Sequence, residues 1–151
     1  MATARGTVKI RPMVDDDRPA WSELWTAYLE FYDTELPAEV YDVQFTRLCA
    51  GRDFIGLVAE NDSGLVGIAH CIIHDHGWRL EKVCYLQDLF AAPSARGSAV
   101  GRALIEAVYA MADARGAPHV YWLTEEDNDT ARRLYDRIGT LTPFVKYVRP
   151  S

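Results

Sequence analysis

Residues 95–107 read A-R-G-S-A-V-G-R-A-L-I-E-A and have the residue types of an anion-binding loop. The glycines allow the backbone to approach a ligand closely, and Arg96 and Arg102 can donate charge-assisted hydrogen bonds to phosphate oxygens. A helix that begins where the loop ends would add unpaired backbone N–H groups and a partial positive charge. The spacing is neither that of a P-loop nor that of a dinucleotide-binding fingerprint, which excludes both classes. These residues alone leave two alternatives open, a phosphate-binding loop and a strand-to-helix turn.

Residues 28–37, which read Y-L-E-F-Y-D-T-E-L-P, place carboxylates among aromatic rings. The carboxylates are Glu30, Asp33 and Glu35, and the rings are Tyr28, Phe31 and Tyr32. Carboxylates beside aromatic faces suit an ammonium group, which they bind by ion pairing and by cation–π contact. The stretch is therefore a candidate cation-binding site, with a solvated helix end as the alternative.

Apolar periodicity places both stretches within an alternation of strands and helices. Period-two or continuous apolar runs predict strands over residues 7–13, 54–60, 65–73, 82–91, 119–123 and 144–148. Helical spacing predicts one helix around residues 21–29 and further helices over residues 38–49, 100–115 and 127–138. The resulting order, βααβββαβαβ, predicts an α/β (α+β) fold in which helices pack on a mixed sheet.

The size and charge of the chain limit its organisation and its partners. We expect a single domain over residues 1–151, because a second core would be too small to be stable. The net charge of −6 lacks the basic footprint of a nucleic-acid-binding protein, so no nucleic acid partner is expected. No apolar run approaches the ~20 residues of a membrane helix, and the N-terminus lacks a signal-peptide core. These features predict a cytoplasmic protein with no membrane partner.

The cysteines and histidines do not form the pattern of a metal site. The cysteines are Cys49, Cys71 and Cys84, and the clustered histidines are His70, His74 and His76. An odd number of cysteines without CxxC spacing argues against a disulfide framework and against zinc. The histidine cluster is typical of a strand end followed by a solvated hairpin, so we expect no metal.

Residues 96–101, R-G-S-A-V-G, follow the pattern Q/R-x-x-G-x-G/A and resemble motif A of the GNAT superfamily of N-acetyltransferases. One position departs, since Ala99 stands where the family usually has glycine. The preceding Y-L-Q-D-L-F-A is similar to the family's fourth strand, and residues 128–139, N-D-T-A-R-R-L-Y-D-R-I-G, are similar to its motif B. The stretches V-Y-W-L-T-E-E-D-N and P-F-V-K-Y look most similar to the polyamine and histone acetyltransferase-like branch.

The resemblance implies a mixed, mostly antiparallel central sheet of six to seven strands flanked by about four helices. It also implies acetyl-CoA as co-substrate, held by strand-like pairing with the pantetheine arm and by backbone N–H groups around the pyrophosphate. The residues expected to bind it are Leu89, Phe90, Ala91, Arg96, Gly97, Ser98, Ala99, Val100, Gly101, Arg102, Asn128 and Tyr135. We expect Ala99 to keep a negative φ, so that its methyl group costs little.

The family's reaction is direct transfer to a primary amine, and it needs a base and an acid. An alkylammonium group has a pKa near 10.4, so a base or a desolvated site must help to form the neutral amine. Tyr135, which the resemblance places near the sulfur of CoA, can protonate the departing thiolate. Asp88 is the first candidate for the base, although strand alternation predicts that it faces away from Gln87. Glu125, Glu126 and a water chain remain alternatives.

We therefore predict an acetyl-CoA-dependent N-acetyltransferase for a small cationic amine, such as a diamine or polyamine, in a homodimer. The residues expected to bind the acceptor are Tyr28, Glu30, Tyr32, Asp33 and Gln87. Two alternatives stay open. One is a protein acetyltransferase that acts on lysines or on an N-terminus. The other is a catalytically silent acyl-CoA-binding sensor, which Gln87 and Ala99 make conceivable.

Overall fold

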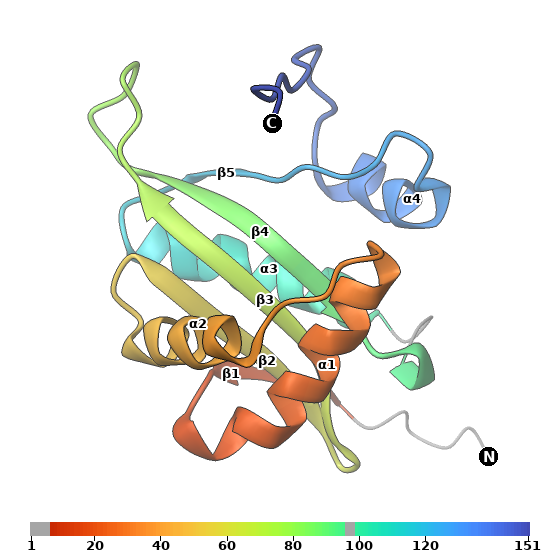
Figure 1. Cartoon of the computed structure of the whole chain (residues 1–151). Helices are drawn as coiled ribbons and strands as arrows, with labels where there is room; N and C mark the ends of the chain where they lie inside the picture. Colours follow the sequence, from red (N-terminus) through yellow and green to blue (C-terminus); the bar gives the residue numbers. More distant parts are fainter. Residues whose placement is uncertain (1–6, 96–98) are drawn as a thin grey trace, which may run out of the picture.

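The computed structural model describes residues 7–95 and 99–151, and its elements form one mixed sheet covered by helices (Figure 1). The strands are β1 (Lys9–Pro12), β2 (Phe54–Asn61), β3 (Gly64–His74), β4 (Val83–Ala91) and β5 (His119–Tyr121). The helices are α1 (Arg18–Phe31), α2 (Ala38–Ala50), α3 (Val100–Ala114) and α4 (Asp129–Ile138), with short 3₁₀ turns η1 (Asp15–Asp17) and η2 (Pro93–Ala95). The strands lie in the order β1-β2-β3-β4-β5, antiparallel from β1 to β4, with β5 parallel to β4.

The predicted α/β class, the mixed and mostly antiparallel sheet and the four helices are confirmed, but the predicted number of strands is wrong. The sheet has five strands, because residues 144–148 form no ladder with any strand that the structure describes. Their backbone groups would need a neighbouring strand to pair with, and β5 offers only three residues. The segment instead lies beyond α4, away from the sheet (Figure 1), with Phe144 and Tyr147 77% and 93% exposed.

Two hydrophobic cores lie on opposite faces of the sheet. Helices α1 and α2 cover one face, where Trp21, Leu48 and Ile68 are fully buried among the core residues. Helix α3 covers the other face, where Leu104 and Val108 pack against the sheet. Strands β2 and β3 are buried on both faces, which explains their nearly continuous apolar sequences. The rigid sheet between the two cores sets the position of every residue that it carries.

A β-bulge in β4 changes which residues of that strand face α1. His70 of β3 pairs with Asp88, whereas the next residue of β3, Cys71, pairs with Leu86, so Gln87 is the extra residue. With uninterrupted alternation, Asp88 would share a face with Leu86, which packs in the core beside α3. The bulge instead turns Asp88 toward α1, where it accepts a hydrogen bond from Trp25.

Candidate active site

A pocket lies where α1, the bulge of β4, the segment after β5 and α4 come together. Its lining residues are Tyr28, Tyr32, Leu86, Gln87, Leu89, Trp122, Leu123 and Tyr135. The pocket opens beside β4 because β5 pairs only with Val83, Cys84 and Tyr85 of that strand. Beyond Tyr85 no described residue of β5 pairs with β4. Aromatic side chains from three different elements therefore converge on one edge of β4.

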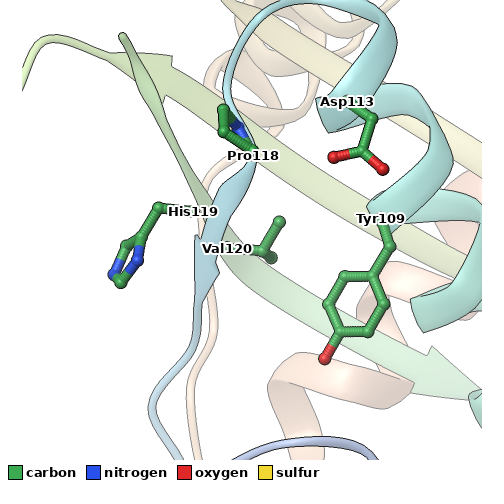
Figure 2. Close-up of a pocket in the computed structure, with 5 residues that line it drawn as sticks. All are labelled: Tyr109, Asp113, Pro118, His119 and Val120. Atoms are coloured by element: carbon green, nitrogen blue, oxygen red, sulfur yellow. The ribbon is translucent and has the colours of Figure 1, made fainter. Parts of the chain in front are cut away.

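A larger cavity of about 360 Å³ lies between α3 and β5, and it does not group reactive side chains (Figure 2). Its titratable residues are Tyr109, Asp113 and His119. The hydroxyl of Tyr109 donates a hydrogen bond to the carbonyl oxygen of Ile138 at 2.7 Å. This hydroxyl therefore has a structural role, joining α3 to the end of α4. The ring of His119 points away from Asp113, on the other side of β5 (Figure 2). The pocket at the β4 bulge is therefore the better candidate.

A buried carboxylate, that of Asp88, lies beside this pocket in a network of hydrogen bonds. Oδ2 of Asp88 is 2.8 Å from Nδ1 of His70 and 3.3 Å from Nε1 of Trp25. Nε2 of His70 is 2.9 Å from Nε1 of Trp21. An indole nitrogen can only donate, so Nε2 of His70 accepts, and Nδ1 carries the proton that it donates to Asp88. The geometry thus defines an imidazole whose Nδ1–H donates to the carboxylate of Asp88.

The tyrosines of the pocket are held in their neutral, proton-donating form. Burial, and then the negative charge of Tyr32, raises the pKa of Tyr135 to about 12. Burial, followed by the negative charge of Asp88, also raises the pKa of Tyr28 well above its usual value. At neutral pH both phenols therefore keep their protons, as a general acid must.

The pocket also has the electrostatic character of a cation site. Burial raises the pKa of Tyr32, and the next largest causes are the negative charges of Glu125 and Asp88. Tyr28 and Tyr32 meet edge to face, with ring centroids 5.1 Å apart. Two carboxylates thus act on a pocket lined by aromatic rings, an arrangement that favours an ammonium ligand.

The structure brings together five of the residues that the sequence singles out. Tyr28, Tyr32, Gln87, Leu89 and Tyr135 line the pocket. The bulge places Asp88 beside it, although strand alternation predicts that Asp88 faces away from Gln87.

Two other residues expected to bind the acceptor lie elsewhere. Glu30 and Asp33 are exposed and do not line the pocket. The acidic residue that acts on the pocket is instead Glu125, from the segment after β5.

The residues expected to bind the cofactor are only partly grouped. Arg96, Gly97 and Ser98 lie outside the described residues, whereas Ala99, Val100, Gly101 and Arg102 form the start of α3. Val100 is buried in the core, and Arg102 forms an ion pair with Glu106 at 2.9 Å. Phe90 is buried between the sheet and α1, and Ala91 ends β4. Asn128 caps α4, because its side chain accepts a hydrogen bond from the backbone N–H of Ala131 at 3.5 Å.

The expected negative φ at Ala99 is wrong. Ala99 has φ 64° and ψ 20°, the left-handed conformation, as the N-cap of α3. A Cβ atom in this conformation crowds the following carbonyl and costs about 1–2 kcal/mol. The family's usual glycine at this position is therefore explained by backbone geometry, and this chain tolerates a strained alanine there.

Replacing Ala99 with glycine should stabilise the protein by about 1 kcal/mol, since the relieved strain exceeds the entropy that glycine adds to the unfolded chain. The midpoint of thermal unfolding should rise by about 2–4 °C for a chain of this size. Ala103→Gly, inside the same helix, is the matched control and should destabilise by about 1 kcal/mol. If Ala99→Gly lowered the midpoint as Ala103→Gly does, the strain at Ala99 would be refuted.

Sequence reasoning missed the residues that surround Asp88. The sequence pattern predicts that His70 belongs to a solvated hairpin, but its side chain is 1% exposed in the interior of β3. His74 bonds instead to the hydroxyl of Tyr121 at 2.8 Å. Among residues 7–95 and 99–151, no three His, Cys, Asp or Glu side chains are grouped as metal ligands. The available signal was the polar ring of His70 within an apolar run, together with two tryptophans four residues apart in α1.

Comparisons with known proteins point to one family. Residues 16–140 match the model of the acetyltransferase (GNAT) family. The D-amino-acid N-acetyltransferase of Saccharomyces cerevisiae is 35% identical over 145 residues, which cover 94% of this chain and 90% of the yeast protein. An uncharacterised N-acetyltransferase of Bacillus subtilis is 27% identical over 142 residues, which cover 93% of this chain and 95% of the Bacillus protein.

A solved structure shows the same fold. The aminoglycoside N-acetyltransferase AAC(6')-Iy in complex with CoA superposes with a TM-score of 0.85 and 20% identity, over 99% of both chains.

No helix in the part of the chain that the structure describes is long and apolar enough to cross a membrane. The family match spans most of the sequence, and the yeast relative aligns over nearly all of it. This chain therefore belongs to the GNAT family and is an N-acetyltransferase.

Proposed function

We propose that this enzyme transfers the acetyl group of acetyl-CoA directly to the primary amine of a small cationic acceptor, at the pocket beside the bulge of β4. The observation that carries the proposal is that Tyr135 lines the pocket while Asp88 lies beside Tyr28, another residue of its lining. A buried carboxylate can take a proton, and a neutral phenol can give one. Both roles belong to the same reaction, so a single domain would contain all of its parts.

Acetyl-CoA as co-substrate is supported by the family and by the CoA complex of a structural neighbour. The present residues fit it at two places. Strand β5 pairs with β4 only as far as Tyr85, so an extended arm would pair with β4 alongside Leu89. The first turn of α3, which begins at Val100, presents backbone N–H groups that suit a phosphate. When bound, acetyl-CoA supplies the thioester carbonyl that the amine attacks.

Two residues of the chain carry protons in the proposed reaction, Asp88 as the base and Tyr135 as the acid. At pH 7 the neutral form of an alkylamine lies about 4 kcal/mol above its ammonium form, so removal of a proton is a substantial part of the barrier. The ammonium group first loses one proton to solvent. The neutral amine then attacks, a second proton passes from its nitrogen to Asp88 as the C–N bond forms, and the C–S bond breaks. Tyr135 protonates the departing sulfur and regains its proton from Asp88 through solvent. No covalent acetyl-enzyme is required.

We propose a small cation as acceptor because aromatic rings line the pocket and the negative charges of Asp88 and Glu125 act on two of them, those of Tyr28 and Tyr32. Structural neighbours act on aminoglycosides, which are polycationic amines, and the yeast relative acts on D-amino acids. A D-amino acid is therefore the second candidate acceptor. Among the described residues that line the pocket there is no lysine or arginine to pair with its carboxylate, so we rank it after a polyamine.

An acceptor panel, read by thiol release from acetyl-CoA, tests this proposal. It should contain a diamine, a polyamine, an aminoglycoside, D-amino acids and a lysine peptide, and the polycations should give the highest kcat/KM. Glu125→Gln should raise the acceptor KM by about fivefold, close to 1 kcal/mol, without changing that of acetyl-CoA. Glu126→Gln removes the same charge at the following residue and serves as the control. CoA binding without turnover on any amine would instead establish the sensor alternative.

We also propose that the enzyme is a homodimer in which the C-terminal segment packs against a second copy. Leu141, Phe144 and Val148 are at least 74% exposed, although the sequence around them is typical of a buried strand. Strand β5 is the last strand of the described sheet, so its outer side offers a place for a further strand. Light scattering should give twice the chain mass, and Phe144→Asp with Val148→Asp should give a monomer. A monomeric parent protein would contradict the proposal.

A further inference from the structure

We propose that His70 is a positioning residue for the reaction: its Nδ1–H, fixed by Trp21, together with Trp25 holds Oδ2 of Asp88 so that the carboxylate keeps one orientation toward the pocket. This inference rests on the proposed function, because it assigns Asp88 the role of base. It concerns residues of α1 and β3 that do not line the pocket.

The first support is the burial of His70. Its ring is 1% exposed, within the core between the sheet and α1, and a polar group in such a place is costly unless both of its nitrogens are bonded. Both are bonded, to Trp21 on one side and to Asp88 on the other. A packing role alone would be filled better by leucine or phenylalanine, which need no partners.

The second support is that the network admits one arrangement of protons. Trp21 can only donate to Nε2, so the proton of the neutral ring must be on Nδ1, where it points at Asp88. The rings that enclose His70 restrict its rotation, because the centroids of Trp21 and Trp25 lie 6.0 and 5.8 Å from it. The donor is therefore fixed in both direction and tautomer.

The third support is the asymmetry of the bonds to Asp88. Nδ1 of His70 and Nε1 of Trp25 both bond to Oδ2, at 2.8 and 3.3 Å. The Asp88 side chain keeps 11% of its surface exposed, and Tyr28, which faces it, lines the pocket. Two donors on one oxygen prevent rotation about the Cβ–Cγ bond. The carboxylate is thereby held in one orientation beside Tyr28.

Other charged groups near this network are few. Within the described residues, the titratable groups that interact with Asp88 are Tyr28 of α1, Tyr32 after that helix, Tyr85 of β4 and Cys71 of β3. Burial raises the pKa of the three tyrosines, and a hydrogen bond with Cys84, followed by burial, raises the pKa of the Cys71 thiol, so all four are neutral at pH 7. The other hydrogen-bond partners in the network are two indoles, that of Trp21 on His70 and that of Trp25 on Asp88, and indoles do not titrate. The imidazole–carboxylate pair is therefore enclosed by neutral groups.

His70→Leu tests the inference against a purely structural role. We expect kcat to fall by about 10- to 100-fold, with acetyl-CoA affinity unchanged, because a base displaced by about 1 Å loses most of its effect. His70→Asn, which keeps a donor near the position of Nδ1, should recover part of the rate. His74→Leu removes a histidine of the same strand that bonds to Tyr121 and should leave kcat within about twofold.

The decisive comparison is made in the Asp88→Asn background. If His70 acts through Asp88, His70→Leu should cause little further loss of kcat there. An equal loss in both backgrounds, or a loss that simply follows a lower unfolding temperature, would overturn the positioning role.

Nitrogen-15 NMR of the imidazole gives a readout that does not depend on turnover, and it should show a neutral ring protonated at Nδ1. A ring protonated at Nε2 alone would overturn the inference even in an active enzyme. If the parent protein acetylated no amine while the ring was protonated at Nδ1, the proposed function would fail and the described pairing would stand.

Discussion

Asp88→Asn is expected to lower kcat by about 10²- to 10³-fold and to leave the dissociation constant of acetyl-CoA within about twofold. The amide has nearly the same shape as the carboxylate, and its oxygen can still accept hydrogen bonds from His70 and Trp25. It cannot, however, take a proton from the amine. The loss should therefore be confined to the chemical step. Initial rates at saturating acceptor, with binding of CoA measured by calorimetry, separate the two quantities.

A matched control for this variant is Asp113→Asn. Asp113 belongs to the larger cavity between α3 and β5, and the exchange makes the same change of charge and shape there. We expect it to keep kcat within about twofold. If Asp113→Asn abolished activity while Asp88→Asn was fully active, the reaction would have to be placed in that larger cavity. Full activity of both variants would leave a water chain as the base.

Tyr135→Phe is expected to lower kcat by about 10²-fold, with a smaller effect on either KM. The variant removes only a hydroxyl group. The aromatic ring at position 135, whose centroid lies 5.4 Å from that of Trp122, should therefore keep this contact. The loss lies at the low end of the range for general acids, because a thiolate with a pKa near 8.5 is already a fair leaving group. Tyr109→Phe is the control, since that phenol bonds to the carbonyl of Ile138. Unchanged kcat in Tyr135→Phe would remove Tyr135 as the acid.

The pH profile provides a second test of Tyr135. Its pKa is raised to about 12, so the phenol should stay protonated and active at every pH below that value. Any fall in kcat between pH 9 and 11 should then persist in the phenylalanine variant. The same shift also bears on stability. Tyrosine in the unfolded chain ionises near pH 10, so the stabilisation from this group is complete below pH 10 and is lost as the pH rises toward about 12.

Much of the pocket could be predicted from the sequence because its residues lie in patterns that local structure preserves. Tyr28 and Tyr32 are four residues apart and come together on one side of α1. Tyr135 lies in a motif of fixed helical spacing, so its position on α4 follows from the positions of its neighbours. Gln87 and Leu89 follow from the strand over residues 82–91. The order of the helices and strands then suffices to predict that these pocket residues come together.

The environment of Asp88 could not be predicted in the same way. Its direction depends on a single extra residue in β4, and a bulge leaves no signature in the pattern of polar and apolar residues there. The bonds from His70 and Trp25 join positions 18 and 63 residues away in the chain, which only the folded sheet brings together.

The conformation of Ala99 and the missing last strand have a different origin. The backbone at position 99 is set by the entry into α3, and it overrides the preference of alanine for negative φ. Residues 144–148 have the composition of a strand, but a strand requires a partner, and the described chain does not supply one. In both cases the local sequence preference is outweighed by tertiary structure.

The central claim is direct transfer of an acetyl group to an amine at the pocket beside Asp88. The measurement that tests it is the stoichiometry of a reaction between purified enzyme, acetyl-CoA and a polyamine, with the N-acetylated amine and free CoA quantified together by mass spectrometry. We predict one N-acetyl amine for each CoA released, no acetylated enzyme, and loss of both products in Asp88→Asn. Release of CoA without acetylated amine, or a stable acetyl group on the protein, would contradict the account.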